Sequence, residues 1–259
     1  LLSDEENTRY CYKIDLHHYY QSINHELLKQ KYRKVFKDPD LLWLLDEIAD
    51  SINTATEEDL IELYLSGEVE VDPNTGIPIG NYMSQYSGNF YLSSFDHFVK
   101  EELQVKHYYR YMDDIVIFAG TKEKLWEIHR RVTAYIQENL HLNIKGNYQV
   151  FPTKVRGVDF VGYRFFGEYT LLRKSTAITF KRKMRSYRKK MENNIPPTYS
   201  EWCSYNSYQG WLMNCDSYRL YKKYMEPLIE YMNNYYESEV KNHGEIRKCS
   251  VKCRHSRAS

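Results

Sequence analysis

The chain has 259 residues, 42% of them hydrophobic, and its 36 Lys and Arg nearly balance 35 Asp and Glu to give a net charge of +1. This composition supports one large folded domain or two small ones. It argues against a membrane-spanning protein, because the mean hydropathy is −0.70 and no apolar run approaches the roughly 20 residues that cross a bilayer. The five cysteines form no paired framework, which favours a reducing cytoplasm.

The first predicted element is a strand over residues 10–14, rich in aromatic and β-branched side chains, with Asp15 at its end. Apolar residues at helical spacing then predict helices over 22–36 and 41–52, with a shorter one over 56–65. A turn at 72–76 and a loop containing Gly80 lead into a long predicted helix over 82–103. The chain begins at Leu1, almost directly before the first strand, so we expect it to lack an N-terminal part.

Two apolar runs, 107–110 and 115–119, flank the sequence Tyr111-Met112-Asp113-Asp114, a pattern that predicts a β-hairpin with two adjacent carboxylates at its tip. Neighbouring carboxylates repel each other unless a cation lies between them and a third group. Mg²⁺ with oxygen ligands satisfies this need best, and Asp15 is the best candidate for the third carboxylate. Three such acids could hold two metal ions that clamp the attacking and leaving oxygens of a phosphoryl transfer.

The second half of the chain continues with a predicted helix over 122–140, four short strands and then mostly helix. The strands are expected at 142–145, 148–151, 158–165 and 169–172, and the helical part, from residue 174, breaks at 196–197 and 214–216. The order of elements predicts an α+β fold, with an antiparallel sheet backed by helices and a helical module after residue 173. Residues 241–259 are expected to form a basic, loosely ordered tail.

The small net charge hides a strong asymmetry between the halves of the chain. Residues 1–120 hold 10 Lys and Arg against 22 Asp and Glu, and residues 121–259 hold 26 against 13. The basic half is therefore expected to follow a polyanion such as a nucleic-acid backbone. The densest basic stretch supplies five candidate contacts to that backbone, Lys181, Arg182, Arg185, Arg188 and Lys189.

These motifs together resemble those of the reverse transcriptases over about residues 8–235. Lys13-Ile14-Asp15 with Tyr19-Tyr20 is similar to the first palm motif, Tyr111-Met112-Asp113-Asp114 to the second metal-binding motif, and Phe160-Val161-Gly162-Tyr163 to the primer-grip hairpin. The resemblance implies a right-hand polymerase with a palm and partial fingers over 1–173 and a helical thumb over 174–240. The fingers strands that normally precede the first motif are largely missing, so this chain is expected to polymerise poorly alone.

The resemblance also implies roles for single residues. Two Mg²⁺ ions would be held by Asp15, the backbone of Leu16, Asp113 and Asp114. Tyr20 would be the steric gate against a ribose 2′-OH, and Lys145 would lie near the incoming triphosphate. Gly80, Ser84 and Gln85 would shape the nucleotide pocket, and Phe160, Gly162 and Tyr163 would hold the primer end.

The loop Gly76-Ile77-Pro78-Ile79-Gly80-Asn81-Tyr82-Met83-Ser84-Gln85 narrows the resemblance. Most bacterial reverse transcriptases carry Gln before the second glycine and Ser-Pro at the end of this motif. This chain has Ile79 before Gly80 and Ser84-Gln85 at the end of the motif. In these two respects it is similar to the reverse transcriptases of diversity-generating retroelements. That subtype implies a bacterial or phage-encoded enzyme that copies a template RNA into DNA from a primer and dNTPs, with errors mainly at template adenines. It also implies a small basic helical accessory protein as partner.

Other interpretations remain open from the sequence. The enzyme could belong to a group II intron, a retron or an antiphage-defence system. The chain could also be a catalytically dormant RNA-binding subunit, although the three intact aspartates argue against this reading. A protein-binding module that uses some of the 26 tyrosines would leave the three aspartates without a purpose.

Overall fold

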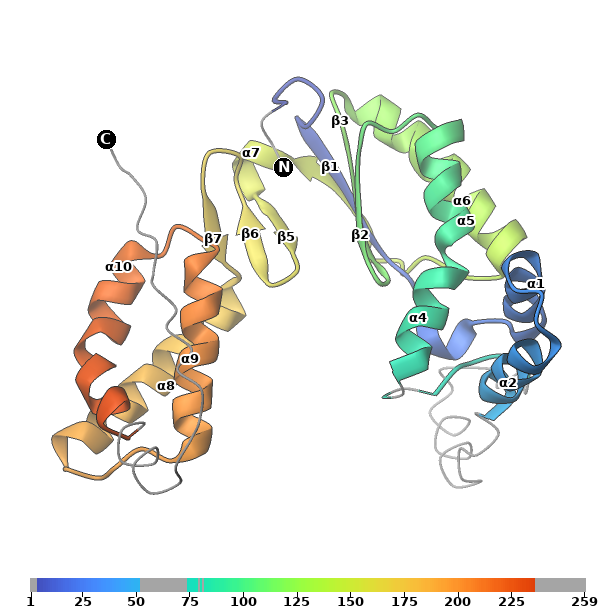
Figure 1. Ribbon diagram of the computed structural model, residues 1–259. Coiled ribbons are helices and arrows are strands. Elements are labelled where there is room, and N and C mark those ends of the chain that lie inside the picture. Colours follow the sequence, from blue (N-terminus) through green and yellow to red (C-terminus); the bar gives the residue numbers. More distant parts are fainter. Residues whose placement is uncertain (1–3, 52–73, 79, 81, 236–259) are drawn as a thin grey trace. The chain divides into compact units, whose positions relative to one another are not determined.

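The computed structural model describes residues 4–51, 74–78, 80 and 82–235 (Figure 1). The chain divides into two compact units, the first ending at Arg156 and the second beginning at Gly157. Each unit has a hydrophobic core of its own. Among the described residues, no helix is both long and apolar enough to cross a membrane.

The described part of the first unit is built on an antiparallel sheet with the strand order β2-β3-β1-β4. Its strands are β1 (Tyr10–Asp15), β2 (His107–Tyr111), β3 (Asp114–Ala119) and β4 (Gln149–Pro152). Side chains alternate between the two faces of a strand. One face of β1 and β3 therefore carries buried apolar residues, among them Tyr12, Ile14, Ile115 and Ile117.

Helix α6 (Lys122–Leu140) packs on this apolar face. Its buried side chains recur at helical spacing and belong to the same core as the strand residues: Leu125, Ile128, Val132, Ile136 and Leu140. The Thr121 side chain caps the first turn by accepting a hydrogen bond from the backbone N–H of Lys124 at 3.3 Å. The predicted helix over 122–140 is thus confirmed at both ends.

The segment after β1 forms a short 3₁₀ turn and two helices. These are η1 (Tyr19–Ser22), α1 (His25–Val35) and α2 (Pro39–Asp50). Asn24 and Asp38 cap the two helices with their side chains, and two ion pairs, Lys29–Asp50 at 2.8 Å and Arg33–Asp46, join them. The short α7 (Thr153–Arg156) closes the unit.

The single long helix predicted over 82–103 is instead three pieces. They are α4 (Tyr82–Tyr91), α5 (Ser93–His97) and the π-helical turn η3 (Phe98–Glu102). The interruption between α4 and α5 is at Leu92, next to Ser93, whose hydroxyl donates to the Phe90 carbonyl at 2.7 Å and so competes with the backbone hydrogen bonds of the helix.

The second unit joins a small antiparallel sheet to a set of helices (Figure 1). The sheet contains β5 (Val158–Phe160), β6 (Tyr163–Phe165) and β7 (Thr170–Leu172) in that order. The helices are α8 (Lys174–Glu192), α9 (Tyr199–Met213), α10 (Tyr218–Leu220), the π-helical η4 (Tyr221–Met225) and the 3₁₀ turn η5 (Glu226–Leu228). One face of α8 packs into the core of this unit through Phe180, Met184 and Tyr187.

The α+β prediction is confirmed, but two strand predictions are wrong in detail. The strand expected over 158–165 is a hairpin, because Val161 and Gly162 both take left-handed backbone conformations and reverse the chain. The strand expected over 142–145 is reduced to an isolated bridge between Leu16 and Ile144. The helix predicted over 56–65 and the tail at 241–259 lie outside the described residues.

Candidate active site

Asp15 and Asp114 lie directly opposite each other on neighbouring strands. Asp15 is the last residue of β1, Asp114 is the first residue of β3, and the antiparallel register pairs the two. Paired residues point to the same face of a sheet, with Cβ atoms about 5 Å apart. This is the face opposite Ile14 and Ile115, so the core does not cover the two carboxylates.

Asp113 occupies the turn that joins β2 to β3, as the hairpin prediction required. Tyr111 pairs with Asp114, which leaves Met112 and Asp113 as a two-residue loop, and Met112 has a left-handed φ of 54°. Partial burial raises the pKa of Asp113, and the charge of the nearby Asp15 carboxylate, together with a hydrogen bond to it, raises this pKa further. The three predicted aspartates therefore gather at one end of the sheet.

Two lysines compensate the negative charge of this cluster. The Lys145 side chain donates to Asp15 Oδ2 at 2.7 Å, and its backbone N–H donates to the Asp15 carbonyl at 2.9 Å. Lys13 Nζ lies 2.9 Å from Asp114 Oδ1. Lys145 was predicted near a triphosphate and is found beside the aspartates, whereas sequence reasoning gave Lys13 no role.

Acidic oxygens of the kind that Mg²⁺ prefers are present at this end of the sheet. No group of three or more His, Cys, Asp or Glu side chains within the described ranges has converged into a metal-binding arrangement. Asp15 and Asp114 are instead paired with Lys145 and Lys13. The carboxyl groups of Asp15 and Asp113 are close enough for the charge of one to raise the pKa of the other. A divalent cation bound between them would relieve this repulsion.

Arg110 anchors the turn and was missed by the sequence reasoning. Its Nη1 donates to the Met112 carbonyl at 3.1 Å and to Asn89 Oδ1 at 2.9 Å, while Nε donates to Asp96 Oδ1 at 2.8 Å. The guanidinium thus joins the hairpin tip to α4 and α5. A signal was available, since Arg110 ends an apolar run and a buried arginine needs a carboxylate partner.

Tyr20 reaches the same turn from η1. Its hydroxyl lies 3.7 Å from Met112 Sδ, and burial followed by the charge of Asp113 raises the pKa of the phenol. Gly88 of α4 lets helix and rings approach, since a Cβ there would lie 3.2 Å from Tyr20 Cε1 and 3.3 Å from Tyr19 Cε1. The structure therefore places the predicted steric gate beside the aspartate turn.

The loop before α4 lies against the same segment. The Ile77 N–H donates to the Tyr20 carbonyl at 2.9 Å. Gly80 has a φ of 96° that favours glycine, Ser84 is buried, and Gln85 is exposed on the next position of α4. Ser84 Oγ has no hydrogen-bond partner within the described residues. The role of these three residues in nucleotide binding stays a prediction, as does that of the Leu16 backbone.

In the second unit, the predicted primer-grip residues form the tip of the β5–β6 hairpin. Phe160 and Tyr163 pair across a two-residue turn in which Val161 and Gly162 have φ values of 46° and 80°. Trp211 of α9 sits against this tip, and a Cβ on Gly162 would lie only 2.3 Å from its ring. The Tyr163 hydroxyl donates to the Trp211 carbonyl at 3.2 Å, so α9 fixes the hairpin.

The five basic residues predicted to contact a nucleic-acid backbone all lie on α8. Arg182, Arg185, Arg188 and Lys189 are exposed, and Lys181 is partly buried. They lie outside the stripe of Phe180, Met184 and Tyr187 that faces the core. This segregation leaves a basic surface along the helix, while nucleic-acid contact itself stays a prediction.

A protein-family model described as reverse transcriptase (RNA-dependent DNA polymerase) matches residues 1–165. The chain belongs to this family. The matched part of the reverse transcriptase includes the three aspartates, Tyr20, Lys145 and the β5–β6 hairpin. A search of the curated proteins found no match.

Solved structures similar to this reverse transcriptase include two yeast telomerases. The telomerase of Candida albicans, in complex with a TWJ fragment of telomeric RNA, is 12% identical over 90% of this chain and 40% of its own, with a TM-score of 0.45. The apo telomerase of Candida tropicalis truncated from the C-terminal domain is 15% identical over 63% of this chain and 35% of its own, with a TM-score of 0.42. The chain thus spans well under half the length of these proteins.

Proposed function

We propose that this chain is an RNA-directed DNA polymerase that joins dNTPs to a DNA primer under the direction of an RNA template. Membership of the reverse transcriptase family supports the reaction class. The observation that carries the proposal is the gathering of Asp15, Asp113 and Asp114 at one end of the sheet. Asp15 and Asp113, with Asp114 beside them, would hold two Mg²⁺ ions.

The bound metal ions would supply Lewis-acid stabilisation of the primer oxygen and the leaving pyrophosphate. The protein's own part is to hold the acids in place. Lys145 fixes the end of β1 through its backbone and side chain together, and its ammonium group is available to a triphosphate once Asp15 binds metal. Arg110 fixes the turn that carries Asp113.

Substrate selection would use the residues around the turn. Tyr20, packed near Met112, would contact the sugar of the incoming nucleotide, and Gly80, Ser84 and Gln85 would line the pocket for the templating pair. Phe160, Gly162 and Tyr163 would position the primer end. The exposed basic residues of α8 would bind the backbone of the template and primer.

We assign the enzyme to the diversity-generating retroelement subtype on the Gly76–Gln85 motif. The assignment predicts a template RNA, an error-prone DNA copy and a small basic helical accessory protein as partner. It is tested by measuring incorporation opposite each of the four template bases. Errors concentrated opposite adenine are expected, and equal error frequencies at all four bases would reject the subtype while leaving the polymerase assignment intact.

The polymerase assignment is tested with Asp113→Asn, which keeps the size of the side chain and removes a metal-binding charge. Primer extension on an RNA template should be lost, because metal binding fails. Asp40→Asn, at an exposed position in the first turn of α2, is the matched control and should extend normally.

Metal binding gives a second readout that does not need catalysis. Mg²⁺ or Mn²⁺ should raise the melting temperature of the unsubstituted chain and of Asp40→Asn, because a ligand of the native state stabilises it. Asp113→Asn should show little or no rise. Equal metal-induced shifts in all three proteins would refute the assignment of Asp113 even if the chain alone proved inactive.

A further inference from the structure

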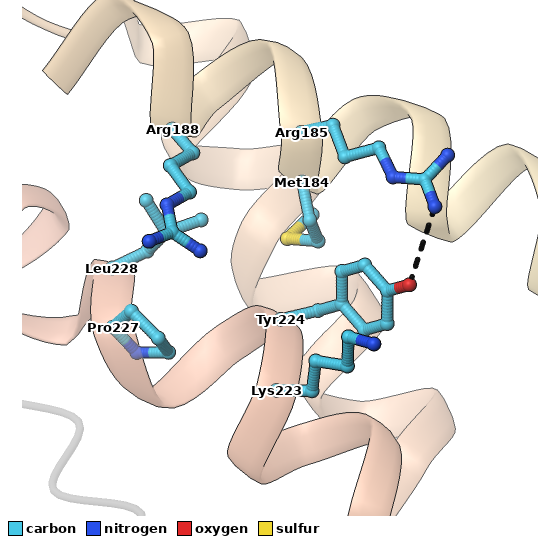
Figure 2. Close-up of a pocket in the computed structure, with 7 residues that line it drawn as sticks. All are labelled: Met184, Arg185, Arg188, Lys223, Tyr224, Pro227 and Leu228. Atoms are coloured by element: carbon cyan, nitrogen blue, oxygen red, sulfur yellow. Dashed lines mark hydrogen bonds between the residues drawn. The ribbon is translucent and has the colours of Figure 1, made fainter. Parts of the chain in front are cut away.

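The second unit contains a hollow of about 160 Å³ between α8 and the segment η4–η5 (Figure 2). Its floor is apolar, formed by Met184 and Leu228, which are buried, with Pro227 at the edge. Tyr224 forms one wall. Neither the primer-grip hairpin nor the aspartate site contributes to its lining.

The rim of the hollow is cationic. Arg185, Arg188 and Lys223 come from two segments and line the hollow, with Arg185 and Lys223 beside Tyr224 and Arg188 on the other side of Met184 (Figure 2), and no acidic residue is among the lining side chains. Arg188 Nε has an exposed partner, Glu192, at 3.2 Å. Within the part of the chain that the structure describes, neither Arg185 nor Lys223 has a carboxylate partner. Three positive charges at the mouth of a small cavity attract an anion.

Tyr224 links the rim to the wall. Arg185 Nη2 donates to its hydroxyl at 3.4 Å, and both the Arg185 guanidinium and Lys223 Nζ lie 5.8 Å from the centre of its ring (Figure 2). These contacts hold two cations beside Tyr224 without neutralising either of them. Arginine in such a place can bind two oxygens of one phosphate.

We propose that this hollow binds one unpaired nucleotide of a single-stranded nucleic acid. The two phosphates that flank this nucleotide lie at the rim, one at Arg188 and the other at Arg185, and the base covers the floor of Met184, Pro227 and Leu228 (Figure 2). A duplex backbone would reach only the rim, because its bases are stacked and paired, whereas an unpaired nucleotide can turn its base inward. The inference rests on the proposed function in that the ligand is a strand of the template or product.

The test measures binding of a short fluorescein-labelled oligo(A) RNA to the full chain, without Mg²⁺ or dNTPs. Arg185→Gln and Arg188→Gln should each weaken binding by roughly tenfold, because each removes a charge-assisted phosphate contact. Arg219→Gln removes the same charge from an exposed position on α10 and should change affinity by no more than about twofold. Equal losses in all three variants would overturn the site in favour of general electrostatic attraction.

The floor is tested by filling it. Pro227→Phe places a ring at the edge of the hollow without changing charge, and Pro227→Ala controls for loss of the proline. Pro227→Phe should weaken the binding of single-stranded RNA by roughly tenfold and change the affinity for an RNA–DNA duplex by no more than about twofold. Unchanged single-strand affinity, or equal loss for both ligands, would overturn the role of the floor.

A competition experiment tests whether the hollow recognises a nucleotide or only its phosphate. AMP should displace the oligonucleotide from the unsubstituted chain, and inorganic phosphate at the same concentration should not, since it cannot use the floor. Displacement by both or by neither would overturn the proposal. Because these measurements need neither metal nor dNTPs, their outcome is independent of whether the chain polymerises.

Discussion

Arg110 holds Asp96 through two parallel hydrogen bonds, from Nε to Oδ1 at 2.8 Å and from Nη2 to Oδ2 at 2.5 Å. The remaining nitrogen of the same guanidinium reaches the carbonyl of Met112 at 3.1 Å. The position of the aspartate turn is therefore set by α5 as well as by the hairpin that carries it. Such a planar fork cannot be replaced by an ammonium group.

Arg110→Lys should accordingly slow primer extension more than it unfolds the protein. We expect kcat to fall by about 10–100-fold with little change in the KM for primer and template, because a displaced turn misplaces Asp113. The Mg²⁺ concentration that gives half-maximal activity should rise as well. Arg130→Lys, on the exposed face of α6, is the control. A variant whose only defect is a lower melting temperature would show that Arg110 has a structural role alone.

Tyr20→Ala should relax the choice of sugar. The ring lies beside Met112, and removing it opens space next to the aspartates, so ribonucleotides should be incorporated more readily relative to deoxyribonucleotides. The ratio of kcat/KM for the two nucleotides measures the effect, with an expected change of at least about tenfold. Tyr20→Phe keeps the ring and should retain discrimination. Unaltered selectivity in Tyr20→Ala would remove this residue from the role of gate.

Replacing either of two glycines of the second unit with alanine should change the stability of the fold, and the two changes should have opposite signs. Gly162→Ala combines a left-handed φ of 80° with a contact of 2.3 Å to the Trp211 ring, and we expect it to destabilise the fold by about 2–4 kcal/mol. Gly210→Ala, inside α9 with nothing within 4 Å, should stabilise by about 0.5–1 kcal/mol. Urea unfolding followed by tryptophan fluorescence measures both. The same sign for the two changes would contradict the geometry.

Lys31 should make stability depend on pH in the alkaline range. It is only 9% exposed, bonds to Ser94 Oγ at 2.6 Å, and burial followed by repulsion from Lys34 lowers its pKa to about 8. Between pH 8 and the ordinary lysine value near 10.5, the unfolded chain holds the proton that the native chain has lost. Stability contributed by this residue therefore rises with pH over that interval.

The measurement compares Lys31→Met with the unsubstituted chain from pH 7 to pH 10. The free energy of unfolding of the unsubstituted chain should gain roughly 2–3 kcal/mol relative to the variant over this range. Lys124→Met, at an exposed position on α6, should show no such drift. A constant difference between Lys31→Met and the unsubstituted chain would mean that Lys31 keeps its ordinary pKa.

The sequence predicted best where a periodic apolar pattern meets a clear boundary. Helix α6 is such a case, with a threonine cap before Lys122 and a left-handed His141 after Leu140. The aspartate hairpin was predictable because two apolar runs flank a short polar turn. Both features depend on neighbours in sequence, so a single chain contains the information needed to find them.

The features that escaped prediction depend on partners far along the chain. The clamp of Arg110 needs Asn89 and Asp96 from other elements, and the pairing of Lys13 with Asp114 crosses two strands. The apolar pattern over 158–165 predicts one strand because valine favours extended backbone, whereas the resemblance to a primer-grip hairpin implies the reversal that the structure shows at Val161 and Gly162, where Gly162 packs against Trp211. Local propensity loses in this case to a tertiary contact.

The packing of Gly162 against Trp211 also couples the sizes of two residues that are far apart in the sequence. The indole ring occupies the place where a side chain at position 162 would begin, so neither residue can grow without the other shrinking. Homologues that carry a larger residue in the hairpin tip should therefore carry a smaller one on α9. The tip of the β5–β6 hairpin and helix α9 would then change together during evolution.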